Sequence, residues 1–576
     1  MLRLNELKLP LDHSEEALSA EIIKILAIRS EDLVGYTVFK RSYDARKKNT
    51  IFLIYLVDVE LKDELEEALL EKFAQSNSVK KSPDTSYQFV GQASKGFPNV
   101  EQQRPIVIGF GPCGILAALV LAQMGLKPIV LERGQDVRQR TKDTWGLWRD
   151  RKLNTESNVQ YGEGGAGTFS DGKLYSQVKD KRFLSRKVLD EFVKSGAPEE
   201  ILFVSKPHIG TFKLVKMVEN MRAEIIGLGG EIRFNCKVES IHRTANKPEP
   251  GAGSNSSNSS SNSRSDSNFS NDSFSMEDKG EITGLTLANG DILKSKHVIL
   301  AIGHSARDSF QMLLDQKVYI EPKPFSIGFR IEHPQSVIDK ARFGDNAGHP
   351  ILGAADYKLV HHCKSGRTVY SFCMCPGGTV VAATSEEGGV VTNGMSQYSR
   401  NERNANSAIV VGIDPEKDYP GHVLAGIDLQ RSLEQKAFEM GGSNYDAPAQ
   451  LVGDFLKNRA STEIGSVTPS YKPGIRLGDL SNAIPEFAID AIREAIPAFD
   501  RKIKGFSMND AILTGIETRT SSPICIRRDK LLQSINTKGL YPAGEGAGYA
   551  GGILSAAIDG IKVAEAVALD ILNLRE

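Results

Sequence analysis

A short apolar run, a glycine-rich turn and a second apolar run constrain this chain more than any other feature. Ile106-Val107-Ile108 leads into Gly109-Phe110-Gly111-Pro112-Cys113-Gly114, which matches G-x-G-x-x-G. An alanine-rich helical pattern follows, and the next predicted strand ends at Glu132, near the spacing of about 20 residues expected for an acid in this motif. A strand, a tight turn, a helix and a strand ending in an acid are typical of a dinucleotide-binding βαβ unit.

Each glycine of the turn has a physical reason. Gly109 allows the sharp turn out of the strand, Gly111 lets the backbone approach a pyrophosphate, and Gly114 lets the helix lie close to the sheet. The unpaired N–H groups and the positive end of the helix dipole then face the phosphates. Glu132 is expected to bind ribose hydroxyl groups. The alternative is a turn that only caps a helix, but the two flanking strands and the acid favour the dinucleotide.

A second glycine-rich segment follows at residues 158–173 and reads NVQYGEGGAGTFSDGK. So many glycines are unfavourable inside a helix or a strand, so the segment is predicted to be a loop. Its backbone is expected to approach the far side of a bound dinucleotide, and a merely flexible loop is the alternative. The residues expected to contact the ligand here are Gly164, Gly165, Gly167 and Thr168.

Residues 1–92 are predicted to form a separate small domain, followed by a linker at 93–104. The strand and helix patterns give the order βαββαβ, which is that of a ferredoxin-like α+β domain. The expected strands are 2–9, 36–42, 50–60 and 86–90, and the expected helices are 14–28 and 63–73. RNA-binding modules share this order, but the strands lack the aromatic motif that stacks bases, so the basic turn at 46–49 is interpreted as a solvated turn.

The fold class predicted for the whole chain is α/β, with a Rossmann-like dinucleotide-binding domain that an α+β domain interrupts. The binding domain spans 105–321 and resumes at 507–576, and the inserted substrate or cap domain spans 322–506. Residues 244–278 are rich in Ser and Asn. Such a stretch cannot bury enough apolar surface to offset its ordering entropy, so it is predicted to be a disordered insert within a hairpin.

The composition of the chain limits the kinds of molecule that it is expected to bind. The formal net charge is −1, from 71 basic and 72 acidic residues, which argues against a general nucleic-acid binder. The six cysteines are few and scattered, as in proteins of a reducing cytosol. The first ten residues do not resemble a signal peptide, and no apolar run has the length of a membrane span. We therefore expect a cytoplasmic protein that binds a small-molecule substrate, without a membrane span and without nucleic acid.

Four motifs in this order carry a resemblance: IGFGPCG, GEGGAGTFSDGKL, LAIGHSARD and YPAGEGAGYAGGI. With them the chain resembles FAD-binding proteins of the glutathione-reductase-like group, which carry two dinucleotide-binding motifs. More closely, it is similar to a family of FAD-dependent dehydrogenases with a ferredoxin-like N-terminal domain. The likeness covers nearly the whole chain except the Ser/Asn-rich insert.

The resemblance implies that FAD is the cofactor, and it assigns residues to it. The first three glycines would hold the pyrophosphate, Glu132 with its neighbour Arg133 the adenosine ribose, and Gly303 would close the adenine side. Glu545, where such proteins more often have Asp, would meet the ribitol together with Gly544. Gly551 and Gly552 would begin a helix whose positive end faces the flavin N1–O2 edge and favours the anionic reduced flavin.

Three motifs that would indicate other kinds of chemistry are absent from the sequence. No second G-x-G-x-x-G occurs at a strand-to-helix turn, so a dedicated NAD(P)H domain is not expected. No C-x-x-C or C-x₄-C pair lies beside the glycine loops, which argues against the flavin–disulfide class. His361-His362-Cys363 and Cys373-Met374-Cys375 match no common zinc spacing, so no metal is predicted, and these thiols are interpreted as buried or reactive.

Arginines of the inserted domain, and of the segment that returns from it to the binding domain, are the candidates for substrate contact. Arg519, Glu517 and Arg330 are predicted to be catalytic, with Arg519 positioning an anionic substrate, and Arg400 is a further candidate. A structural salt bridge is the alternative for each arginine. The sequence thus favours a flavin-dependent oxidoreductase that transfers a hydride to or from a small organic substrate. A nucleotide-binding protein without turnover, or an RNA-associated factor, is the alternative, and no motif identifies the electron donor or acceptor.

Overall fold

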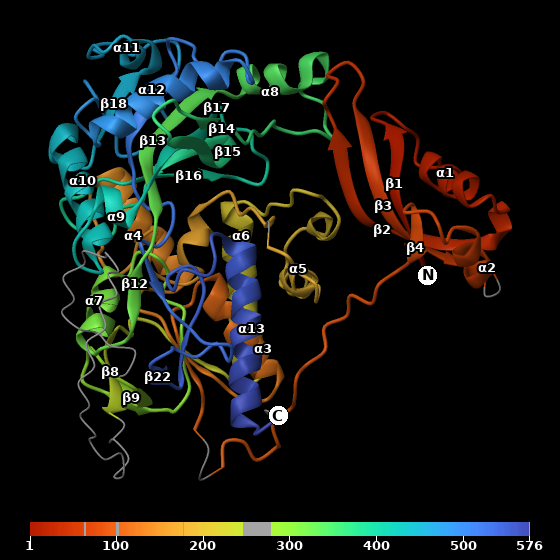
Figure 1. Ribbon diagram of the computed structural model, residues 1–576, viewed down its shortest axis with the longest axis horizontal. Helices are drawn as coiled ribbons and strands as arrows, with labels where there is room; N and C mark the ends of the chain where they lie inside the picture. The colour runs from red at the N-terminus through yellow and green to blue at the C-terminus, as the bar shows by residue number, and fades with distance from the viewer. Residues whose placement is uncertain (63–64, 100–102, 177, 246–277, 575–576) are drawn as a thin grey trace, which may run out of the picture.

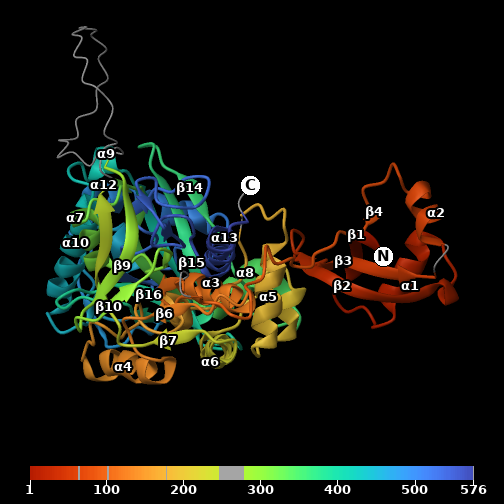
Figure 2. The same ribbon diagram turned by 90° about the horizontal axis from the view of Figure 1, so that it is seen from below.

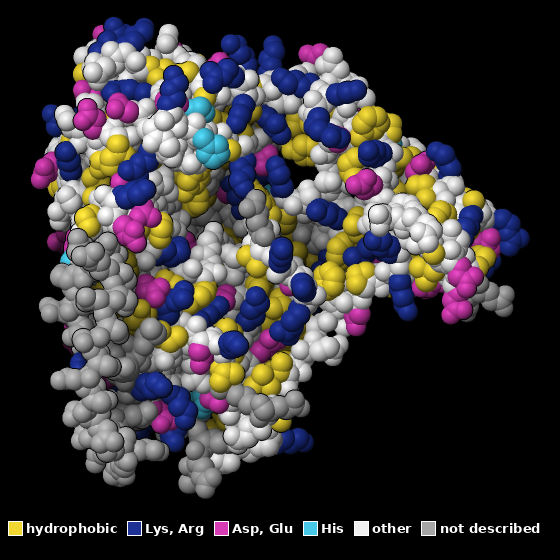
Figure 3. Space-filling view, viewed as in Figure 1, with side chains coloured by type: hydrophobic (Ala, Val, Ile, Leu, Met, Phe, Trp, Pro, Cys, Tyr) yellow, Lys and Arg dark blue, Asp and Glu magenta, His cyan; other side chains and the backbone are white. Residues whose placement is uncertain are grey.

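The computed structural model describes residues 1–62, 65–99, 103–176, 178–245 and 278–574. Most of the predicted insert at 244–278 lies outside the described residues. Figures 1 and 2 show a main body formed by two packed parts and a small N-terminal domain that projects from one side of it, and the space-filling view of Figure 3 shows the same projection. Within the described part of the chain, no helix combines the length and the apolar character that crossing a bilayer requires.

The N-terminal domain is a four-stranded antiparallel sheet with the strand order β2-β3-β1-β4 and two helices. Its elements are β1 (Leu2–Pro10), α1 (Ala17–Leu26), β2 (Leu33–Asp44), β3 (Phe52–Leu61), α2 (Leu65–Lys72) and β4 (Val79–Lys81). Leu18, Ile22 and Leu26 are the buried residues of α1, at the spacing of one helix face. The order βαββαβ agrees with the sequence pattern. The last strand does not lie at 86–90, because that segment runs along the main body, where Tyr87 Oη donates to Glu565.

A five-stranded parallel sheet with the order β23-β11-β5-β6-β7 forms the part for which the sequence predicts nucleotide binding, which we call the nucleotide-binding part. Its strands are β5 (Ile106–Ile108), β6 (Ile129–Leu131), β7 (Glu231–Arg233), β11 (Val298–Leu300) and β23 (Leu540–Pro542). Helix α3 (Pro112–Gln123) follows β5 and is buried along most of its length, since α13 (Ile553–Ile571) packs against it (Figure 1). A Cβ atom on Gly560 of α13 would lie 2.2 Å from the Cys113 carbonyl oxygen, so only glycine permits this contact.

The other elements of this part surround the sheet. They are α4 (Val137–Asp150), α5 (Leu184–Lys194), α6 (Thr211–Gly227), α7 (Arg307–Asp315), β8 (Val238–Ala245), β9 (Gly280–Leu287), β10 (Ile292–Lys294) and β22 (Thr537–Lys538). Strands β8 and β9 pair antiparallel up to Ala245 and Gly280, so the residues between them interrupt a hairpin, as the sequence predicts.

The cap is built on an eight-stranded sheet with the order β14-β15-β17-β13-β20-β18-β19, in which β16 also pairs with β15. Its strands are β13 (Phe325–Pro334), β14 (Val360–His362), β15 (Thr368–Ala382), β16 (Thr392–Ser396), β17 (Asn404–Ile413), β18 (Ala447–Leu451), β19 (Ile475–Leu477) and β20 (Ile512–Glu517). Its helices are α8 (Gln335–Phe343), α9 (Pro415–Asp418), α10 (Ala425–Gly441), α11 (Val452–Leu456) and α12 (Glu486–Asp500). Because β20 pairs with β13 and β18, the sheet extends past the boundary expected at residue 506.

Two chain segments join the cap to the nucleotide-binding part. Strand β12 (Ile320–Pro322) pairs antiparallel with β21 (Ile524–Ile526), so the outgoing and returning segments cross side by side. Short 3₁₀ turns complete the structure at Ser30–Asp32, Gly165–Phe169, Glu199–Leu202 and Gly344–Asn346. The two crossing segments place the cap sheet over the glycine turns of the nucleotide-binding part.

The N-terminal domain contacts the main body through β2 and the β2–β3 turn, beside α8 in Figure 1. The Arg41 amide donates to the Phe203 carbonyl oxygen at 2.6 Å, and the Ser205 amide donates back to the Arg41 carbonyl at 2.8 Å. The Tyr43 ring meets Phe343 edge-on with centroids 5.7 Å apart. Burial is the main cause that raises the pKa of Tyr43 to about 12, so its phenol stays neutral at this contact.

Candidate functional site

A cavity of about 1120 Å³ lies between the nucleotide-binding part and the cap. Pockets for drug-sized ligands measure about 300–1,000 Å³, so this cavity is large enough for a dinucleotide with a second molecule beside it. Among the predicted residues, those that line it are Gly109, Gly111, Glu132, Arg133, Gly165, Gly167, Gly303, Glu517, Arg519, Gly544, Glu545, Gly551 and Gly552. Residues predicted from five separate stretches of sequence therefore meet around one space.

Four predicted residues do not line the cavity, namely Gly114, Gly164, Thr168 and Arg330. A Cβ on Gly114 would lie 2.0 Å from the Gly109 carbonyl oxygen, and one on Gly164 would lie 2.0 Å from the Thr168 hydroxyl. Gly114, Gly164 and Thr168 thus shape the two glycine turns from behind, whereas Arg330 lies on β13 of the cap. Their contacts are with the protein, so a direct contact with a ligand remains a prediction for them.

In the first glycine turn, the fold requires Gly109 to be glycine but does not require Gly111 to be glycine. Gly109 has a φ of +95°, and a Cβ there would lie 2.4 Å from the Ala301 carbonyl oxygen, so the strand-to-helix turn itself requires glycine. Gly111 has an ordinary φ of −82°, and the nearest atom to an added Cβ is the Gly165 Cα at 3.5 Å. The protein alone would accept a methyl group at Gly111, and its exposed side is the cavity.

Glu132 connects the two glycine-rich loops. Its carboxylate accepts hydrogen bonds from the amides of Phe110, Gly134 and Gly162, each at 2.9 Å, and only 5% of the residue is exposed. A carboxylate has about four acceptor positions. Three of them hold the loops in place, so one remains for the ribose hydroxyl that the sequence assigns to this residue.

Arg133 lies beside Glu132 and is held by three partners. Its guanidinium binds Glu156 and Asp308, both at 2.8 Å, and it lies over the Tyr161 ring at 4.1 Å. The hydrogen bond and charge of Arg133 lower the pKa of Asp308 against the opposing effect of burial. Arg133 therefore forms a fixed wall at this end of the cavity, with its charge already balanced.

The C-terminal turn is fixed by residues that the sequence did not single out. The Gly544 amide donates to Asp559 Oδ2 at 2.8 Å, and Asp559 forms a two-pronged ion pair with Arg528. Glu545 Oε1 lies 3.5 Å from His304 Nδ1. The signal that would have identified Asp559 is an acid in the apolar first half of the last helix, since a buried acid needs a partner.

Helix α13 begins at the cavity wall. Gly551 and Gly552 are exposed, and no atom lies within 4 Å of a Cβ added to either residue. The helix has no side-chain cap and no acidic residue in its first turn. Its free N–H groups and the positive end of its dipole are therefore directed to the cavity, where they would stabilise negative charge.

The candidate arginines are all ion-paired. Arg330 has no exposed surface and binds Glu517 at 3.0 Å, and Arg519 binds Glu434 at 2.7 Å. Arg400 binds Asp171 and does not line the cavity. Arg330 therefore supports Glu517 from behind, while Glu517 and Arg519 reach the cavity. Arg519 also donates to the hydroxyls of Ser305 and Ser385, so its direction is fixed as well as its charge.

Several further residues line the cavity that sequence reasoning did not assign to a site. They are Tyr161, Lys173, His304, Cys373 and Asn393. Tyr161 and Lys173 lie within the second glycine-rich segment, so their position in a predicted ligand loop was the available signal. Cys373 and Asn393 lie on cap strands. The sequence marked Cys373 only as one of a pair of buried or reactive thiols, and no local pattern marks Asn393.

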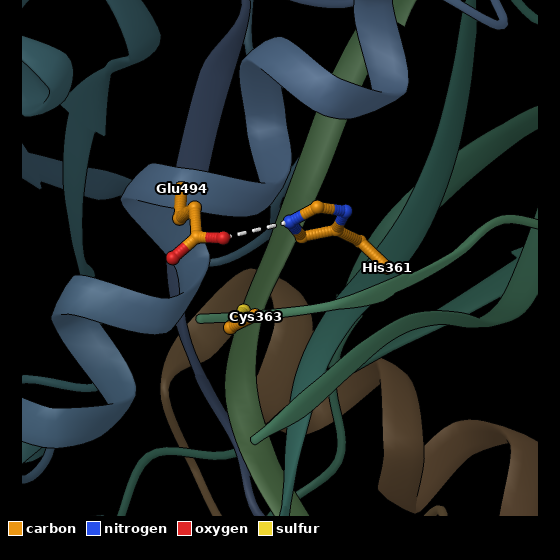
Figure 4. Close-up of side chains that lie close together, drawn as sticks. All are labelled: His361, Cys363 and Glu494. Carbon is orange, nitrogen blue, oxygen red and sulfur yellow. Dashed lines mark hydrogen bonds and ion pairs between the residues drawn. The ribbon is translucent and has the colours of Figure 1, made fainter. Parts of the chain in front are cut away.

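A separate cluster of potential metal ligands lies between β14 and α12 (Figure 4). Ligand atoms of His361, Cys363 and Glu494 all lie within 4.8 Å of one another, and none of the three lines the cavity. His361 Nε2 lies 3.0 Å from Glu494 Oε1, and the Cys363 thiol lies 3.6 Å from the Ala491 carbonyl oxygen. These contacts account for the cluster as packing of the β14 hairpin on α12, so the prediction of no metal stands as a prediction.

Comparisons with known sequences match the cap and the N-terminal domain to family models, and nearly the whole chain to one relative. Residues 324–520 match a family model described as "FAD-dependent protein, C-terminal domain-like", and residues 1–60 match one described as "Domain of unknown function". A protein of Clostridium beijerinckii with the name "Uncharacterized protein" is 46% identical over 567 residues, which cover 98% of each chain. The first matched range ends shortly after β20, as the cap sheet does.

The solved structures that align with this chain are distant. L-proline dehydrogenase from P. horikoshii aligns with 82% of this chain and 94% of its own, at 13% identity and a TM-score of 0.32. CtdE in complex with FAD aligns with 82% and 90%, at 12% identity and a TM-score of 0.28. L-amino acid deaminase from Proteus vulgaris aligns with 85% and 97%, at 11% identity and a TM-score of 0.29. Similarities this distant do not indicate a substrate.

Proposed function

The chain belongs to the same family as the Clostridium beijerinckii protein, and we propose that it is an FAD-dependent oxidoreductase of the glutathione-reductase-like group. In this proposal a hydride passes between FAD and a small organic substrate that binds under the cap. One observation carries the proposal: both glycine turns, Glu132 and the start of α13 open onto the same cavity as the cap residues. The N-terminal βαββαβ domain is assigned a ferredoxin-like fold.

The cavity fits the proposed cofactor. Gly111 leaves open space on the side where a pyrophosphate would approach, beside the N–H groups at the start of α3. Glu132 has one acceptor position left for the adenosine ribose, and the turn at Gly544 and Glu545 would meet the ribitol. When bound, FAD would supply two-electron chemistry that protein side chains cannot perform themselves.

The chain's own residues then position the substrate and exclude water. The cap covers the cavity, and the start of α13 favours negative charge that develops next to it. Glu517, Asn393 and Lys173 are among the polar side chains that line the cavity at the cap end and would contact the substrate there. Arg330 acts indirectly, by fixing the direction of the Glu517 carboxylate.

The test is the flavin content and reactivity of the purified full-length protein. We expect a yellow protein with about one FAD per chain, released intact on denaturation, and anaerobic bleaching by a member of a panel of organic substrates. NADPH alone should reduce it slowly, since the chain has a single dinucleotide fingerprint. Release of a different nucleotide would contradict the FAD assignment, and FAD that no substrate reduces would favour a binding protein without turnover.

A further inference from the structure

Strand β15 places two cysteines at the cap end of the cavity. Phe372 is opposite Ala408 and Cys375 is opposite Asn406, so β15 carries one residue more than β17 in this interval and forms a bulge. Cys373 lies in that bulge with a φ of +45°, and it lines the cavity. Cys375 has no exposed surface and does not line the cavity, so it lies behind Cys373.

The two cysteines are in contact. The Cys375 thiol donates a hydrogen bond to the Cys373 carbonyl oxygen at 3.4 Å. A Cβ on Gly394 would lie 2.9 Å from the Cys375 sulfur, so the protein encloses this sulfur on its inner side. A molecule in the cavity can therefore reach Cys373 directly, and Cys375 only through Cys373.

Charges around the pair favour a thiolate at Cys373. Lys173 also lines the cavity, and its Nζ lies 3.7 Å from Asp171, which is itself held by Arg400 at 3.0 Å. Arg330 donates to the Cys373 carbonyl oxygen at 3.2 Å. The hydrogen bond from Cys375, with the charges of Lys173 and Arg330, lowers the pKa of Cys373 to about 6, against burial and the charge of Glu517. The same hydrogen bond and burial raise the pKa of Cys375.

We propose that Cys373 and Cys375 form a thiol–disulfide exchange centre, with a small disulfide as the ligand that enters the cavity. The sequence has no C-x-x-C or C-x₄-C pair beside the glycine loops, whereas this C-x-C pair belongs to the cap. Lysines on the cavity wall suit a disulfide that carries carboxylates. Lys358 lies there, and Lys173 and Lys206, which are paired with Asp171 and Asp356, each have three donor hydrogens and can bind a second carboxylate. Exchange itself uses only the two thiols. Repeated turnover would also need the flavin, so only that part rests on the proposed function.

The exchange balances without a further reagent. The Cys373 thiolate attacks one sulfur of RS–SR, forms a mixed disulfide and releases RS⁻. Cys375 then loses its proton to the released thiolate and attacks the Cys373 sulfur, so that a Cys373–Cys375 disulfide forms and the second RS⁻ leaves. Two electrons pass from the protein dithiol to the small disulfide, which is recovered as two thiols once the second thiolate takes a proton from water.

The experiment uses the full-length protein, reduced, desalted and mixed with oxidised glutathione. Wild type should release two thiols per chain and gain a Cys373–Cys375 disulfide, identified by peptide mass mapping. Cys375→Ser should stop at a glutathione adduct on Cys373 with one thiol released, and Cys373→Ser should react at least about 100-fold more slowly. Cys236→Ser removes another cavity thiol and is the matched control, with an unchanged rate expected.

The pH dependence gives a second measurement that needs no cysteine variant. Iodoacetamide should label Cys373 of wild type at a rate that rises with pH around a midpoint of about 6, because only the thiolate reacts. Lys173→Met should move this midpoint towards the ordinary thiol value of about 8.5. The groups facing the thiol are Lys173, Arg330, Cys375, Asp171 and Glu517.

Opposite results would overturn the proposal. Fast exchange by Cys373→Ser, an adduct on another cysteine, or an ordinary midpoint for Cys373 would each do so. Flavin content measured on the same samples separates the two proposals. Exchange without bound FAD would leave this centre intact and overturn the proposed function, whereas bound FAD without exchange would do the reverse.

Discussion

Gly111 and Gly114 belong to one turn, yet their missing side chains serve different purposes. We expect Gly111→Ala to fold as wild type, because its φ is ordinary and the nearest atom to the new Cβ is 3.5 Å away. The methyl group would occupy the approach of the pyrophosphate, so the FAD content should fall at least about tenfold, which corresponds to about 1.4 kcal/mol. Absorbance of the purified protein near the flavin maximum measures this.

Gly114→Ala is the matched comparison. Its Cβ would lie 2.0 Å from the Gly109 carbonyl oxygen, so the helix must move away from the strand. We expect a loss of about 1–3 kcal/mol in the free energy of unfolding, as for other overpacked sites. Thermal unfolding of the two variants separates the roles. Equal destabilisation of both, with FAD retained by folded Gly111→Ala, would contradict the assignment of Gly111 to the ligand.

At the scale of elements, the β8–β9 hairpin accommodates a long insertion while its strands remain paired up to the insertion. The strands pair up to Ala245 and Gly280, and Asp278 binds Lys317 and Arg243 just before β9 begins. Replacing residues 246–277 with Asn-Gly should therefore leave a short hairpin loop of ordinary length. Loop-closure entropy changes slowly with length, so we expect the Tm and the FAD content to stay close to those of wild type.

A second replacement serves as the control for that prediction. Extending the deletion through Asp278 also removes the carboxylate that Lys317 and Arg243 bind. We expect this longer deletion to lower the Tm slightly while the shorter one does not, since partly exposed ion pairs contribute up to about 1 kcal/mol. If the shorter deletion emptied the flavin site, the inserted residues would have a structural task.

At the scale of the whole molecule, the sequence predicted the elements that short stretches of sequence determine, such as a turn or a hairpin. The structure places the Gly109–Gly114 turn between a strand and a helix, and the hairpin strands flank the insertion. Strand β4 was misplaced because it has three residues, of which only Val79 is buried, so it carries almost no alternation. β20 was not assigned to the cap, because its partners β13 and β18 are distant in sequence.

The candidate site also has a part that the sequence predicted and a part that it did not. Backbone-driven sites, such as the glycine turns, were predictable because glycine leaves a signature in the sequence. At the cap end the sequence indicated Glu517 and Arg519 but not that they meet Lys173 and Cys373, because these residues come from distant segments that come together only through the packing of the cap on the glycine loops. Sequence also suggested the arginines as substrate contacts, but the buried carboxylates that neutralise them, such as Glu434, carry no local signal.

The N-terminal domain is expected to stabilise the molecule without taking part in cofactor binding. No described residue before Ile108 lines the cavity, whereas β2 covers Phe203 and the fully buried Phe343 of the main body. A protein that begins at residue 85 keeps the hydrogen bond from Tyr87 to Glu565 but exposes the apolar surface under β2. We therefore expect the truncated protein to retain about one FAD per chain and to unfold at a lower temperature.

Tyr43→Ala in the full-length chain isolates the contact. It removes the ring that meets Phe343 and leaves the rest of the domain in place, so its Tm should lie between those of wild type and the truncated protein. The lost edge-to-face pair and its buried area are together worth about 2–4 kcal/mol. Flavin absorbance and thermal unfolding are read on the same three samples. A truncated protein with native circular dichroism but no flavin would show that the N-terminal domain does take part in forming the cofactor site.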